Sequence, residues 1–206
     1  MQAAQRGPDD EGGSKLFGMD ELEWFARNSY NLGLKHVDTW NLRHTVRILT
    51  ACLKIIDQVP SDISPQILDD LVLKVIFSRF VIVSALVSLA RAQDNIEAQL
   101  QDYLLLRSHV SAFDAQLVPS LDSMDPLSRK DMLRKLATLL SFDFEASICL
   151  KEWDDLSGIV LKTGPCMCPI SLQSMADCLI RSAAPGQGVS LNNSHESLKH
   201  FEMSDS

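Results

Sequence analysis

Glycine is scarce in the middle of this sequence. Of its nine glycines, only Gly18, Gly33, Gly158 and Gly164 fall between residues 17 and 182. Strands joined by tight turns usually need glycine at the turns, and the alternating pattern of half-buried strands is also mostly absent. The sequence therefore predicts an all-α protein made of successive helices.

An excess of positive charge is also lacking. The formal net charge is −8 and the pI is near 5.0, whereas proteins that bind nucleic acid directly usually carry a basic surface that supplies much of the affinity. We therefore predict no direct contact with nucleic acid.

The cysteines lack the even number and regular spacing of a disulfide framework. There are five, and no signal peptide precedes them, which indicates a reducing intracellular compartment. Cys166, Cys168 and Cys178 could in principle bind zinc with His195 and His200, but C-x-C is not the usual structural zinc spacing. We predict no metal and no cofactor.

The most apolar stretch, Leu71 to Ala90, is long enough to cross a bilayer but is not free of charge. Lys74 and Arg79 lie inside it, where charged side chains are costly in a membrane. A helix that is apolar nearly all round is also expected where neighbouring helices cover several of its faces. We therefore predict a central buried helix and no membrane association.

Start and stop signals divide the chain into helices. The predicted segments span about residues 20–36, 40–59, 65–90, 95–117, 126–140, 142–150, 153–160 and 171–181. Ser64 with Pro65 and Asp125 with Pro126 each supply an N-cap followed by proline at the first helical position. The other predicted N-caps are Asp38 or Thr39, Asp94 with Glu97 in a capping box, and Ser171.

Two of these helices have a predicted buried face. In the first helix one face repeats at three-to-four spacing and is marked by Phe25 and Leu32; its residues are Leu22, Phe25, Ser29, Leu32 and His36. The second helix has a regular apolar stripe of Leu42, Val46, Leu49, Leu53 and Ile56.

Short connections make neighbouring helices antiparallel. The predicted architecture is antiparallel helical hairpins stacked as a TPR-like α-solenoid fragment, although the periods are longer and less regular than in the TPR. This helical-repeat domain covers residues 17–182, between a disordered arm (1–16) and a disordered tail (183–206) that are rich in glycine and polar residues.

The sequence contains no specific pattern of a nucleophile with its base, a metal cluster or a phosphate loop, so we predict a non-enzymatic protein without a small-molecule substrate. Candidate partner-binding residues are Arg43, Arg47 and Lys54, which share one face of the second helix near Lys35 and His44. A solvated face without a partner is the commoner meaning of such a strip.

Aromatic and acidic residues give further candidates. Trp24, Trp40 and Trp153 could each anchor a partner peptide, although tryptophans at helix-packing positions are more often core residues, and Trp153 is our aromatic candidate. We interpret the carboxylates around Trp153 as exposed charge at helix ends rather than an acid–base pair. They are Asp143, Glu145, Glu152, Asp154 and Asp155.

Four blocks of sequence resemble a known family. They are ELEWFARNSYNLGLKH at 21–36, RILTACLKIID at 47–57, SLARAQDNIEAQLQDYLLLRSHV at 88–110 and LLSFDFEASICLKEWDDLSGIVLK at 139–162. Together they resemble the C-terminal part of the fungal meiosis proteins of the sporulation-specific protein 22, or zipper-four, type. The resemblance covers about residues 17–182, and members of that family are much longer.

The resemblance implies a TPR-like scaffold in the nucleus, on meiotic chromosomes. Such a scaffold helps to recruit crossover-promoting proteins during meiotic recombination and sporulation, and links them to chromosome-axis proteins during synapsis. The alternative is a general helical-repeat adaptor unrelated to meiosis.

Overall fold

The computed structural model describes residues 17–60, 63–166 and 168–183, and within these ranges the chain is helical with no strand. The helices are α1 (Met19–Lys35), α2 (Leu42–Ile56), α3 (Pro65–Arg91), α4 (Ile96–Leu117), α5 (Pro126–Leu150), α6 (Leu156–Thr163) and α7 (Pro169–Ala183). Short 3-10 turns are η1 (Val118–Ser123), η2 (Trp153–Asp155) and η3 (Gly164–Cys166). The all-α prediction is confirmed. The predicted arm and the predicted tail, apart from Ala183, lie outside the described residues.

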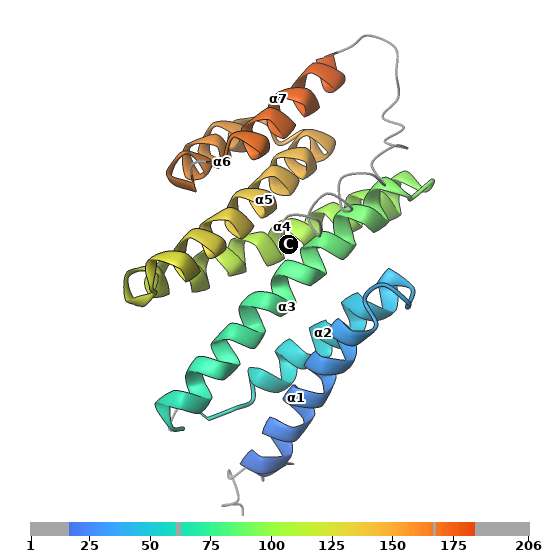
Figure 1. Ribbon diagram of the computed structural model, residues 1–206. Coiled ribbons are helices and arrows are strands. Elements are labelled where there is room, and N and C mark those ends of the chain that lie inside the picture. Colours follow the sequence, from blue (N-terminus) through green and yellow to red (C-terminus); the bar gives the residue numbers. More distant parts are fainter. Residues whose placement is uncertain (1–16, 61–62, 167, 184–206) are drawn as a thin grey trace, which may run out of the picture.

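The helices are stacked in the order of the chain. Figure 1 shows α1 and α2 at one end, α3 and α4 in the middle, and α5 with α6 and α7 at the other end. Most of the packing is between helices that follow one another in sequence, because short connections turn each helix back along its predecessor. The helices are unequal, from 8 residues in α6 to 27 in α3, so the hairpins are not equal repeats.

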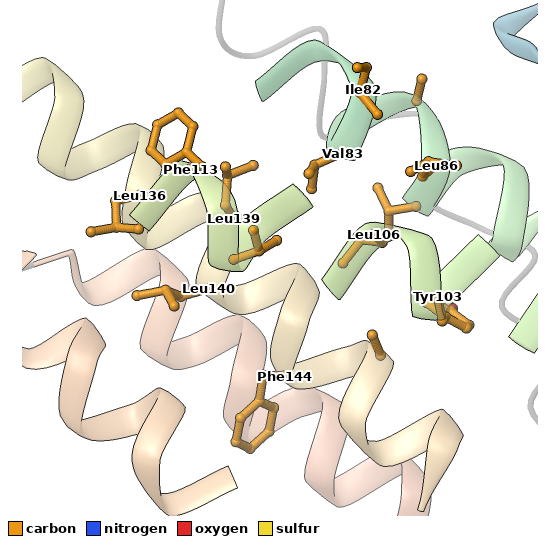
Figure 2. Packing of buried hydrophobic residues seen from close by; sticks show 14 of the residues in the cluster. Ile82, Val83, Leu86, Tyr103, Leu106, Phe113, Leu136, Leu139, Leu140 and Phe144 are labelled. Carbon is orange, nitrogen blue, oxygen red and sulfur yellow. The ribbon is translucent and has the colours of Figure 1, made fainter. Parts of the chain in front are cut away.

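The main core is formed by α3, α4 and α5. Figure 2 shows side chains from the three helices meeting between the ribbons: Ile82, Val83 and Leu86 of α3, Tyr103, Leu106 and Phe113 of α4, and Leu136, Leu139, Leu140 and Phe144 of α5. By length and composition alone α3 could cross a membrane, yet half of its most apolar stretch is buried inside this protein. Its position agrees with the predicted central helix.

The predicted stripe of α2 packs as expected. The face predicted for α1 is only partly correct, because Leu22 is buried but the two residues that mark the face are not. Phe25 and Leu32 are each 40% exposed, whereas Ala26 and Gly33 are buried. A Cβ atom on Gly33 would lie 2.5 Å from Cδ2 of Leu49, so α2 approaches α1 at the residue without a side chain. The buried face of α1 is therefore set by close packing at small residues. Such residues have low hydropathy, so an apolar pattern does not mark them.

Several predicted boundaries also need correction. The predicted break near residue 141 does not exist, and α5 continues to Leu150, since no glycine or proline interrupts residues 127–150. The polar Asp143 within it forms an ion pair described below. The N-caps of α2 and α4 are Asn41 and Asn95, whose side chains accept from Arg43 N and Ala98 N at 2.8 and 3.0 Å. Asp, Thr and Asn are all good N-cap residues, so their types alone do not show which of several neighbours is the cap. The backbone turn before the helix decides which side-chain oxygen reaches the first free N–H groups.

Other starts were predicted correctly or nearly so. The N-caps Ser64 and Asp125, each followed by proline, are confirmed. The last helix starts at Pro169, so Ser171 lies inside its first turn and is buried.

Candidate protein-interaction surface

Most of the buried charge in this fold joins helices to one another. Arg43 of α2 donates to both carboxylate oxygens of Asp102 of α4, at 2.5 and 2.9 Å. Asp102 is buried, and a bidentate guanidinium–carboxylate pair fixes orientation as well as distance. Arg43 therefore holds α2 against α4 and is not a free cation of the predicted basic strip.

A group of three side chains, Arg91, Tyr103 and Glu145, connects α3, α4 and α5. Arg91 donates to the two oxygens of Glu145 at 3.0 and 2.5 Å, and the Tyr103 hydroxyl donates to Glu145 Oε1 at 2.8 Å. Burial first, and then the neighbouring carboxylate, raises the pKa of Tyr103, so its hydroxyl stays protonated and remains a donor. Each group of this buried triad has a partner.

Arg107 of α4 gathers carboxylates from α5 and the turn that follows it. It donates to Asp143 at 2.9 Å and to Asp155 at 2.7 Å, and it pairs with Glu152 as well. Burial raises the pKa of Asp143 although the Arg107 guanidinium opposes the shift. The backbone turns back here through Lys151, which has a left-handed φ of 62°.

A fourth polar contact, which joins α3 to α4, involves a neutral histidine. Arg79 donates to His109 Nδ1 at 3.3 Å and to Gln116 Oε1 at 3.1 Å. Burial, with a smaller contribution from the Arg79 charge, lowers the pKa of His109 to about 4. The ring is therefore uncharged at neutral pH and can accept from Arg79.

These contacts change the interpretation of the acidic cluster. Asp143 and Glu145 are buried and paired, so the expectation that they are exposed charge at a helix end is wrong. Their chemistry is that of structural ion pairs, which specify how the helices are aligned. Only the nearby Trp153 and the carboxylates of the turn remain at the surface, and Trp153 is 51% exposed.

A shallow, open hollow lies at the N-terminal part of α2 and the turn before it. Its volume is about 440 Å³, and it is lined by Trp40, His44, Arg47 and Ile48. His36 stacks on the indole of Trp40, with ring centroids 4.6 Å apart and an angle of 7° between the planes. The hollow therefore combines an aromatic ring, which stacks on a second ring, with basic groups. We call these four lining residues the α2 hollow.

The basic strip predicted on α2 continues from this hollow. Arg47 and Lys54 are exposed, and neither has an ion-pair partner within the described residues. The helix contains no Asp or Glu between Leu42 and Ile56. Two of the three predicted cations are thus available at the surface. The sequence predicted Trp40 as a possible anchor but did not place it beside Arg47, and it gave no signal for Ile48.

A second exposed group lies on α1. Phe17, Trp24 and Phe25 touch edge to face, with ring centroids 5.6 Å apart for Phe17 and Phe25 and 5.1 Å apart for Trp24 and Phe25. Trp24 is 58% exposed, so it is not a core residue. Large aromatic side chains left at a surface are enriched in protein interfaces.

The cysteines contribute no metal site in the part of the chain that the structure describes, where no three His, Cys, Asp or Glu side chains converge. Burial raises the pKa of Cys178 to about 12, and it raises the pKa of Cys166 as well. His195 and His200, considered above as zinc ligands, lie outside the described residues.

Comparison with known proteins adds no relative, because no family model matches this chain and no curated protein or solved structure is significantly similar to it. The resemblance of the four sequence blocks to the meiotic family therefore stays a prediction.

Proposed function

We propose that this chain is a non-enzymatic scaffold that binds partner proteins, and that it does so in the nucleus on meiotic chromosomes. Its helical hairpins form a fragment of a TPR-like α-solenoid. Its partners are crossover-promoting and chromosome-axis proteins. The meiotic part of the proposal rests on the four sequence blocks alone.

The observation that supports a binding scaffold is the distribution of polar and aromatic groups. Charged side chains such as Arg43, Glu145 and Arg107 form ion pairs between helices, which specify how the helices are aligned. At the α1–α2 end, by contrast, exposed aromatic side chains lie near exposed cations without an ion-pair partner among the described residues, as Trp24 and Arg47 illustrate. Rigid helices that present aromatic anchors are a common basis of peptide recognition.

Localisation tests the meiotic role directly. The tagged protein, expressed from its own promoter, is imaged in vegetative cells and in spread meiotic nuclei of its source organism. We expect foci on pairing chromosomes that are absent during vegetative growth. A constitutive cytoplasmic signal would contradict the meiotic role and favour a general helical adaptor.

A further inference from the structure

We propose that the α2 hollow binds an acidic protein segment that carries one apolar anchor side chain. This inference deepens the proposed scaffold function and rests on it, since it names the chemistry of one partner. It follows from the shape of the hollow, its charge and its attachment to the rest of the fold.

The hollow is shallow and open, with a volume of about 440 Å³, so a single side chain of a partner could lie over it. Trp40 and Ile48 supply apolar lining, and Ile48 also packs against the core. An apolar anchor from a partner would contact the indole, which is held by its stacking on His36.

The charge of the rim selects an acidic partner. Arg47 borders the hollow, and Lys54 lies two turns further on the same face of α2, about 10 Å along the axis. No carboxylate on α2 neutralises them, although the chain as a whole carries a net charge of −8. Arginine pairs well with carboxylates because its planar fork can donate two parallel hydrogen bonds.

The site is held in place by its neighbour on the helix. Arg43, one turn before Arg47, is fixed to Asp102 of α4, so this part of α2 cannot shift easily against the stack. A binding residue on an anchored helix loses less conformational entropy than one on a loop.

A protein segment fits better than a nucleic acid. The net charge of −8 disfavours a long polyanion, which would contact much of the surface. A short acidic segment senses mainly the charges within about 8 Å, the screening length at physiological salt. The segment needs one or two carboxylates for Arg47 and Lys54, next to the apolar anchor.

Trp40 itself can report the binding. In the double variant Trp24→Phe and Trp153→Phe, which alters two exposed side chains, Trp40 is the only remaining tryptophan. The probe is a twelve-residue peptide of Asp and Glu with a central Leu. One control peptide has Ser in place of Leu, and another has Asn and Gln in place of Asp and Glu. A single-stranded oligodeoxynucleotide is the competing polyanion.

We expect a saturable change in Trp40 fluorescence with the acidic Leu peptide that weakens as salt is added. Arg47→Glu should weaken binding about tenfold or more. The matched control is Arg181→Glu on α7, an exposed cation at the other end of the stack, which should bind like the parent. Circular dichroism verifies that each variant is folded.

Three outcomes would overturn the inference: no saturable signal with the acidic Leu peptide, equal binding by Arg47→Glu, or tighter binding of the oligonucleotide. The result is separable from the localisation test. Peptide binding without meiotic foci would refute only the meiotic role, whereas foci in cells together with failed peptide binding would refute only this use of the hollow.

Discussion

Glu145 is the residue at which one substitution should loosen three helices at once. Its carboxylate on α5 accepts from Arg91 of α3 and from Tyr103 of α4, and only 6% of the residue is exposed. Glu145→Gln keeps nearly the same size and one acceptor oxygen for the tyrosine. It removes the negative charge opposite Arg91, so the change tests the ion pair rather than the packing.

The expected loss follows from burial. Removing one partner of a buried ion pair costs about 3–5 kcal/mol. The Arg91 side chain is still 26% exposed and water can solvate it in part, so we expect about 2–3 kcal/mol. For a protein of this length that corresponds to a fall in Tm of about 4–12 °C.

Urea unfolding followed by circular dichroism measures the difference. The double variant Glu145→Gln with Arg91→Met should lose less than the sum of the single variants by at least about 1 kcal/mol, because each single change leaves the other group unpaired. The matched control is Glu23→Gln, which breaks the surface pair with Arg27 on α1 and should cost under about 0.5 kcal/mol. Additive single effects, or equal losses for Glu145→Gln and Glu23→Gln, would refute the reasoning.

Three further substitutions test the backbone and the buried histidine. Gly33→Ala should lower the Tm, since the new Cβ would lie 2.5 Å from Leu49 Cδ2. The cost of overpacking, about 1–3 kcal/mol, is larger than the gain in helix propensity. An unchanged Tm would contradict the close approach of the two helices. Lys151→Gly should raise stability by about 1 kcal/mol because φ is 62° there, whereas Lys151→Ala should not. Because the pKa of His109 is lowered to about 4 by burial and by Arg79, the unfolded chain, with its pKa near 6.5, binds a proton first as pH falls. The unfolding free energy should therefore decrease between pH 6.5 and 4 by up to about 1.4 kcal/mol per pH unit, and His109→Gln should flatten that decrease in urea titrations at several pH values; equal slopes would argue against it.

Local signals in the sequence predicted the helical class and many helix limits. The pairs Ser64–Pro65 and Asp125–Pro126 identify helix starts because capping and the fixed φ of proline act within a few residues. The apolar stripe of α2 correctly predicted which side of the helix packs against the core. This signal is also local, because the period of 3.6 residues is set by the geometry of the helix itself. The exposure of Arg47 and Lys54 follows from that stripe, because they lie on another face of the helix.

Contacts between distant residues decided the rest. Arg43 and Asp102 are 59 positions apart, and Arg91 and Glu145 are 54 apart, so no spacing rule marks them as partners. The buried face of α1 depends on how closely α2 approaches at Gly33. The sequence by itself determined that helices form and where several begin. Only the tertiary structure decided which charges are buried in pairs and which stay free to bind, because pairing depends on the distance between helices and not on the order of residues along the chain.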